Sequence, residues 1–340
     1  MKRILYFLLS SFLACALPCV ASHLGTGKST LTRLDEAGHL YILDYKEDYK
    51  LDDVISSGIV PVDSLIGFLS VVLNGGMPAP KDIDAGSGCA SFRAFTPEGD
   101  AMFCRNYDYR HDPVAVVIRT APENGYRSLG IADAGWLGIK PGGLEAASPM
   151  AAFMPYATLD GMNEKGVAIS VMELNGYYTF QKAPSKPTVG TSVAIRMVLD
   201  KAASVDEAIA LLEGCNMRSV KEKSDFHFLI ADASGKAVVV EYIGNEMKVL
   251  DKGIVANDHL TPGVGAGPAS CPRYRTMQAA LTHSRDTLSA IDAMNLLSLV
   301  RQGGHRGGAP TQWSAVYNLD RLEMDLCVNM EYSDKRHFNL

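Results

Sequence analysis

The stretch Gly88-Cys89-Ala90-Ser91-Phe92 decides the fold, and Arg105-Asn106-Tyr107-Asp108 begins sixteen residues after its cysteine. The intervening residues alternate like two strands joined by a turn, with strands over 90–95 and 101–107 and turn residues at 96–100. A hairpin of this length brings Arg105 and Asp108 back beside Cys89. A thiol with an arginine and a carboxylate as neighbours has the partners of a nucleophile, which indicates chemistry on amide bonds.

Residues 1–22 are predicted to be a secretory signal peptide. Met1-Lys2-Arg3 is basic, the run from Ile4 to Leu17 is almost wholly apolar, and Val20-Ala21-Ser22 offers small residues for cleavage. The apolar run is shorter than the roughly 20 residues of a membrane span. We therefore expect a secreted or periplasmic protein with no membrane span. Phe12-Leu13-Ala14-Cys15 is similar to a lipoprotein cleavage site but lacks its aliphatic first residue, so lipid anchoring is the less favoured alternative.

The composition indicates a globular protein without a nucleic-acid-binding surface. The chain is 47% hydrophobic and 21% charged, which allows a substantial core, and its net charge of −6 argues against nucleic acid as a partner. Removal of the signal peptide leaves an odd number of cysteines, which fits one reserved thiol plus zero, one or two disulfides. No two cysteines form a C-x-x-C pair, so no zinc or redox site of that spacing is predicted. The remaining cysteines are Cys89, Cys104, Cys215, Cys271 and Cys327.

After the signal peptide we expect a pro-segment, residues 23–88, and a catalytic domain, residues 89–340. The pro-segment contains a helix candidate, Val62 to Leu73, followed by a stretch rich in Pro, Gly and Asp. Further strands are predicted over 114–120, 151–159, 166–174, 226–231, 237–242, 313–319 and 324–330. Helices are predicted over 191–203, 204–212, 273–281 and 289–301, the second one starting at the capping box of Ser204 and Glu207. This order predicts an α+β fold in which helices cover antiparallel sheets.

Six short motifs occur in the order found in one enzyme family. They are Gly88-Cys89, Cys104 to Asp108, Gly161 to Gly166, Val255-Ala256-Asn257, Arg273-Tyr274 and Trp313 to Asn318. The chain from Cys89 to Leu340 resembles the choloylglycine hydrolase family of N-terminal nucleophile hydrolases. The resemblance implies a four-layer αββα sandwich whose cysteine becomes the first residue of the working chain. It implies no metal or organic cofactor.

The length of the leader resembles one branch of that family. At 66 residues it is similar to the pro-regions of acid ceramidase and N-acylethanolamine acid amidase, which cut themselves before the cysteine, whereas bile-salt enzymes have very short leaders. Such a cut creates a base, because a free α-amine with a pKa of about 8 can accept the thiol proton and a peptide nitrogen cannot. The helical pro-segment would then remain as a noncovalent subunit, since its apolar stretch at 65–69 needs a cover.

The resemblance also implies roles for individual residues. Asp108 would hold the new α-amine, Arg105 would orient the thiol and the substrate carbonyl, and Asn257 would donate a hydrogen bond to the oxyanion. Arg273 lies 16 residues beyond Asn257, a short interval that is similar to that of the ceramidase-like branch.

Glu173 is a further sign of that branch. Counting without a gap from the motif at 161–166 puts Glu173 where bile-salt hydrolases usually have asparagine, whereas a shift of two residues would put Asn175 there. We favour Glu173, and we expect a cysteine amidase that hydrolyses the linear amide of an N-acyl conjugate, preferably a fatty-acyl amide. The alternatives are a bile-salt hydrolase, a penicillin V acylase and, in a different class, a non-catalytic binding protein on the same scaffold.

Overall fold

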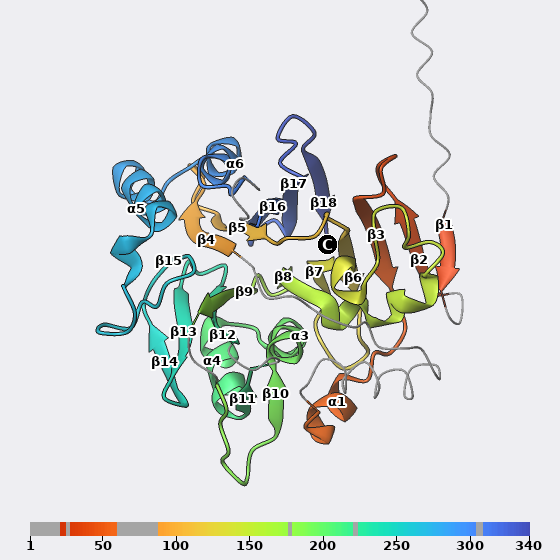
Figure 1. Ribbon diagram of the computed structural model, residues 1–340, viewed down its shortest axis with the longest axis horizontal. Coiled ribbons are helices and arrows are strands. Elements are labelled where there is room, and N and C mark those ends of the chain that lie inside the picture. Colours follow the sequence, from red (N-terminus) through yellow and green to blue (C-terminus); the bar gives the residue numbers. More distant parts are fainter. Residues whose placement is uncertain (1–20, 25–27, 60–87, 176–178, 220–223, 304–308) are drawn as a thin grey trace, which may run out of the picture.

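The computed structural model describes residues 21–24, 28–59, 88–175, 179–219, 224–303 and 309–340. Over these ranges two β-sheets lie face to face, and helices cover the outer face of each sheet (Figure 1). Three apolar cores result, one between the sheets and one under each helical layer. The four-layer αββα sandwich implied by the sequence resemblance is confirmed.

The first sheet has ten strands in the order β1-β2-β3-β6-β7-β8-β9-β12-β13-β14. Neighbouring strands are antiparallel except for β3 and β6, which are parallel. Their bounds are β1 (Ala21–Leu24), β2 (Ser29–Arg33), β3 (Leu40–Tyr45), β6 (Ala115–Thr120), β7 (Ser128–Asp133), β8 (Thr158–Asn163), β9 (Ala168–Asn175), β12 (Ser224–Ala231), β13 (Ala237–Ile243) and β14 (Glu246–Leu250). Two short strands, β10 (Thr188–Gly190) and β11 (Asn216–Arg218), form a separate parallel pair.

The second sheet has six strands and contains the predicted cysteine hairpin. Its order is β15 (Ile254–Val255), β4 (Gly88–Phe95), β5 (Ala101–Asp108), β16 (Thr311–Asn318), β17 (Glu323–Val328) and β18 (Arg336–Asn339), all antiparallel. The hairpin of β4 and β5 closes through a hydrogen bond of 2.8 Å from the Thr96 N–H to the Asp100 carbonyl. In this register Gly88 lies opposite Asp108 and Cys89 lies opposite Tyr107.

Helices form the two outer layers. On the first sheet lie α1 (Leu51–Ser57), α3 (Thr191–Lys201) and α4 (Val205–Glu213), and on the second lie α5 (Pro272–Ser284) and α6 (Ala290–Leu299). Half of the capping box predicted for α4 is present, because the Ser204 side chain accepts the Glu207 N–H at 3.2 Å. The Glu207 carboxylate accepts the N–H of Ala203, one residue before the N-cap, at 2.8 Å. The 3₁₀ helices are η1 (Ala134–Leu137), η2 (Ser148–Ala157) and η3 (Pro268–Ser270).

One predicted strand is wrong. Residues 151–159 were expected to be extended, but η2 occupies most of this range and β8 begins only at Thr158. Pro149 and Pro155 explain the difference, since a proline has no N–H to donate to a strand ladder. The apolar residues of this segment still reach the core under the first helical layer, where Phe153 and Met154 are buried.

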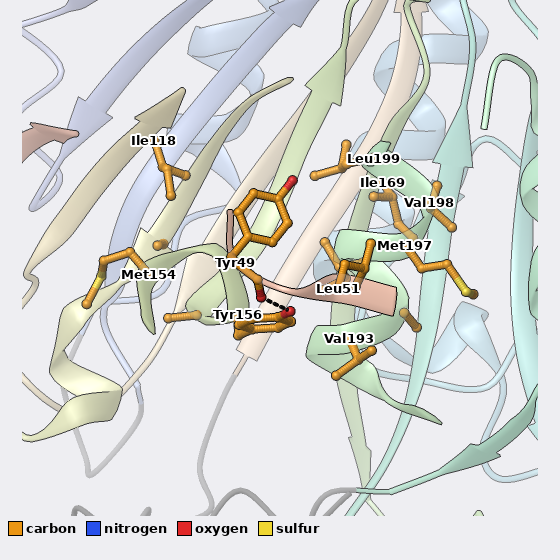
Figure 2. Packing of buried hydrophobic residues seen from close by; sticks show 14 of the residues in the cluster. Tyr49, Leu51, Ile118, Met154, Tyr156, Ile169, Val193, Met197, Val198 and Leu199 are labelled. Atoms are coloured by element: carbon orange, nitrogen blue, oxygen red, sulfur yellow. Dashed lines mark hydrogen bonds between the residues drawn. The ribbon is translucent and has the colours of Figure 1, made fainter. Parts of the chain in front are cut away.

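The described part of the leader belongs to the main fold. It contributes β2, β3 and α1, and β3 pairs with β6 of the later chain over the whole of Leu40–Tyr45. Strand β1 begins at Ala21, within the range expected to be the signal peptide. Figure 2 shows Tyr49 and Leu51 among side chains of the later chain, with the Tyr156 hydroxyl donating to the Tyr49 carbonyl at 2.6 Å. The helix predicted at 62–73 lies outside the described residues.

No helix in the described ranges is long and apolar enough to cross a membrane. All five cysteines in those ranges are free thiols and are buried, so the structure contains none of the disulfides that the odd count would have allowed.

Candidate active site

The thiol of Cys89 lies at the start of β4 on the face that packs against the first sheet. Cys89 is 1% exposed and belongs to the core between the sheets. Burial raises the pKa of Cys89 to about 11, although the guanidinium of Arg105, whose Nη2 lies 3.5 Å from Sγ, opposes that rise. The thiol is therefore protonated at neutral pH and covered by its surroundings.

Arg105, on the second sheet, is held in place by two strands of the first sheet. Its Nη1 donates to the Val171 carbonyl on β9 at 2.7 Å, and its Nε lies 3.0 Å from Oδ2 of Asp160 on β8. Asp160 in turn accepts hydrogen bonds from Trp313 Nε1 at 3.1 Å and from the Tyr317 hydroxyl at 2.5 Å. Two residues of the motif at 313–318 thus orient the carboxylate that orients Arg105. Asp160 was missed in the sequence, although it directly precedes the motif at 161–166.

Asp108 is fully buried at the end of β5 and accepts three side-chain hydrogen bonds. Arg273 Nη1 and Gln302 Nε2 donate to Oδ2 at 2.8 and 2.7 Å, and Thr311 Oγ1 donates to Oδ1 at 2.5 Å. Burial raises the pKa of Asp108, while the three donors oppose that rise. Gln302 and Thr311 are further residues that no sequence motif indicated.

The peptide bond before Cys89 is packed tightly against this carboxylate. A Cβ at Gly88 would lie 1.7 Å from Gln302 Nε2 and 3.0 Å from Asp108 Oδ2, and real Cβ atoms essentially never approach within 3.0 Å of another heavy atom. Any side chain at this position would therefore displace the Gln302 amide from its contact with Asp108.

Asn257 contacts the nitrogen of Cys89 directly. Its Oδ1 accepts the Cys89 N–H and Arg273 Nη2, each at 2.6 Å, and its Nδ2 donates to the Glu173 carbonyl at 2.6 Å. Arg273, from the first turn of α5, therefore bridges Asp108 and Asn257 across the peptide of Cys89. An amide Nδ2 carries two hydrogens, so one remains for a second acceptor.

Glu173 and Asn175 both lie near the end of β9. The Glu173 carbonyl is tied to Asn257, and its partly exposed side chain lies on the face shared by Phe226, its partner in the register. The backbone of Asn175 ends the strand, and its side chain lies outside the described residues. The role of the Glu173 carboxylate stays a prediction.

Five of the six predicted site residues meet in one hydrogen-bonded cluster. Cys89, Arg105, Asp108, Asn257 and Arg273 come from β4, β5, the segment after β15, and α5. Glu173 joins them through its backbone. Among the described residues, no group of three or more His, Cys, Asp or Glu side chains is placed to hold a metal ion.

A family model for linear amide C–N hydrolases of the choloylglycine hydrolase family matches residues 89–260, just over half of the chain. The chain belongs to the choloylglycine hydrolase family. The matched region of this family begins at Cys89 and includes four of the clustered residues, leaving Arg273 beyond its end.

Two curated relatives are similar over parts of the chain. An uncharacterized protein of Paramecium bursaria Chlorella virus 1 is 31% identical over 175 residues, 48% of this chain and 56% of that protein. A penicillin V acylase of Pectobacterium atrosepticum is 29% identical over 102 residues, 27% of each chain. The chain thus spans less than two thirds of the length of either relative.

A solved structure of the same family has the same fold. A mutant of conjugated bile acid hydrolase from Clostridium perfringens aligns with a TM-score of 0.57 and 17% identity, over 74% of this chain and 92% of that one. The fold is therefore that of the N-terminal nucleophile hydrolases.

Proposed function

We propose that this chain is a self-processing cysteine amidase that hydrolyses the linear amide bond of small N-acyl conjugates. The proposal rests on the cluster around Cys89. The backbone N–H of Cys89 donates to Asn257, and the thiol of Cys89 lies beside Arg105. Family membership, from a matched region that starts at this cysteine, supports the same reaction class.

The proposed reaction starts after the bond between Gly88 and Cys89 is cut. The nitrogen of Cys89 is then a free amine, which accepts the thiol proton while one of its N–H groups keeps Asn257 as acceptor. The thiolate attacks the amide carbonyl, and the second hydrogen of Asn257 Nδ2 donates to the oxyanion. The amine of the substrate leaves with the proton, and water hydrolyses the thioester to release the acid.

The burial of the thiol supports the need for a cut. At 1% exposure and with a pKa of about 11, Cys89 of the uncut chain is neither open to a substrate nor ionised at neutral pH. A thiol in this state is a weak nucleophile, because the thiolate is the reactive form.

The cut leader is proposed to stay bound as a subunit. The leader pairs β3 with β6 of the later chain. Its side chains Tyr41, Leu43 and Tyr49 are also buried against the rest of the fold. Tyr49 also donates to Asp200 on α3 at 2.6 Å. Dissociation would expose all of these groups to water, which the hydrophobic effect opposes.

A fatty-acyl amide is the preferred substrate, on the length of the leader, the identity of Glu173 and the 16-residue interval from Asn257 to Arg273. Purified protein should be incubated separately with an N-acylethanolamine, a taurine-conjugated bile salt and penicillin V while free amine or acid is followed. Fastest release from the N-acylethanolamine supports the preference. Faster release from penicillin V would favour the acylase alternative, which the similarity to the Pectobacterium atrosepticum enzyme supports.

The self-cutting step is tested without a substrate. Intact mass should show wild-type protein divided between Gly88 and Cys89, whereas Cys89→Ala remains whole. A wild-type chain that stays whole and releases no product would instead support the non-catalytic binding protein. A Cys89→Ala chain that is cut as fast as wild type would exclude this thiol from the cut.

A further inference from the structure

A second buried polar cluster lies beside the site, and the proposed reaction does not use it. His227 on β12 and Glu241 on β13 are partners in the register, and each is 0% exposed on the strand face that packs between the sheets. His227 Nδ1 lies 3.0 Å from Glu241 Oε1. A charged pair in an apolar sheet is costly to bury, so its contacts indicate what it stabilises.

The pair holds the segment that contains Asn257. On one side of that residue, His227 Nε2 lies 2.7 Å from the Ala256 carbonyl. On the other side, Glu241 Oε1 accepts the Leu260 N–H at 2.7 Å, and Glu241 Oε2 accepts the N–H and the hydroxyl of Thr261 at 3.0 and 2.6 Å. Residues 256–261 are thus fixed at both ends by two side chains of the first sheet.

The acceptors around His227 require two protons on its ring. A backbone carbonyl can only accept, so Nε2 carries a hydrogen that it donates to Ala256. Glu241 already accepts three hydrogen bonds from the segment, which favours its ionised form, so the hydrogen between Nδ1 and Oε1 belongs to Nδ1. His227 is therefore an imidazolium ion paired with a carboxylate.

Other ionisable groups face this pair. Asp225 of β12 and His259 of the held segment lie on the same side, with His259 Nε2 3.9 Å from Asp225 Oδ2 and His259 Nδ1 3.7 Å from Glu241 Oε2. The neighbouring strand β9 places Met172 opposite His227, and β4, which packs on β12, carries Cys89. The carboxylates of Asp225 and Glu241 both favour a positive ring at position 227.

We propose that the His227–Glu241 pair positions Asn257 for turnover, because the ring donates one N–H to Ala256 and the other to Glu241, whose carboxylate holds Leu260 and Thr261. Without this pair, the segment that carries Asn257 is free to move relative to Cys89. The inference rests on the proposed amidase function for its kinetic consequence, but its structural part stands independently.

The protonation state is measured on wild-type protein by NMR of heavy-nitrogen-labelled histidine. One ring should carry hydrogens on both nitrogens, and His227→Gln should remove that signal. A His227 ring with a single hydrogen would overturn the proposal, whatever the variants do.

The positioning role is measured in Glu241→Gln, with His337→Gln, an exposed histidine on β18, as the matched control. We expect kcat of Glu241→Gln to fall about ten- to a hundredfold, the loss typical of a misplaced catalytic group, with KM within about twofold. The control should match wild type.

Amide hydrogen exchange separates this inference from the proposed function. Exchange at Leu260 and Thr261 should accelerate in Glu241→Gln, while exchange along β9 stays slow. Wild-type protein that releases no amine from any of the three amides would refute the proposed function, and the ring protons and the exchange rates would still decide the positioning role. Unchanged exchange at these two amides, or an unchanged kcat in an active enzyme, would refute that role.

Discussion

The close approach at Gly88 predicts how the rate of the proposed self-cutting responds when a methyl group is added at this position. In Gly88→Ala the new Cβ would lie 1.7 Å from Gln302 Nε2, so the Gln302 amide must move away and lose its 2.7 Å hydrogen bond to Asp108. A hydrogen bond to a charged group contributes about 1.5–3 kcal/mol. If that bond orients Asp108 during the cut, its loss slows the cut by roughly 10- to 150-fold.

The assay follows intact mass at timed points after cell-free synthesis and gives the fraction of chain cut between residues 88 and 89. Gln302→Ala should slow the cut to a similar extent as Gly88→Ala, because both remove the same hydrogen bond. The double variant should be no slower than Gln302→Ala alone, since the methyl group then occupies the space that the amide has left. This non-additivity is the specific expectation of the reasoning.

The matched control is Gly214→Ala. Gly214 ends α4 with φ −68°, and a Cβ there would come no closer than 3.3 Å to another atom, so its cutting rate should be that of wild type. A Gly88→Ala chain that is cut at the wild-type rate would refute the reasoning. So would a double variant whose slowing is the product of the two single effects.

Three further expectations concern charge and burial. Asp160→Asn removes the carboxylate that pairs with Arg105, and both side chains are 0% exposed. Urea unfolding should therefore show a free energy of unfolding lower by about 3–5 kcal/mol than in wild type. A variant as stable as wild type would argue against a stabilising ion pair. Since the pKa of Cys89 is raised from 9.0 to about 11, alkylation of the uncut chain at neutral pH should be about a hundredfold slower than for an ordinary thiol, as peptide mass spectrometry would show. Burial raises the pKa of Glu241, but hydrogen bonds from His227 and the held segment outweigh it and lower the pKa below the ordinary value of 4.5. The stability that this carboxylate contributes is thus fully present above pH 4.5 and is lost progressively below it. The difference in Tm between wild type and Glu241→Gln should therefore shrink as the pH is lowered below 4.5.

The site residues could be predicted from the sequence where they lie close along the chain. Arg105 and Asp108 follow Cys89 by one hairpin, and alternation of apolar residues sets the register that places Gly88 opposite Asp108. The helix start at Ser204 was predictable for the same reason, because its capping contacts lie within four residues.

The supporting residues could not be found in this way. Asp160, Gln302 and Thr311 reach the site from β8, the segment after α6, and β16, and a lone aspartate, glutamine or threonine in a strand or loop has no distinctive pattern. The polar pair of His227 and Glu241 was equally hidden, since the two residues lie 14 positions apart on different strands and no motif links them.

The sequence alone determined the hairpin that brings Arg105 and Asp108 beside Cys89 and the layered α+β fold, because these depend on local alternation and on ordered motifs. Only the tertiary structure decided that the leader completes the first sheet, that residues 148–157 form a 3₁₀ helix, and that Arg105 is held by Asp160. These features depend on which distant strands become neighbours. That choice is made by the burial of whole sheet faces and by the pairing of buried charges, which are properties of the packed molecule.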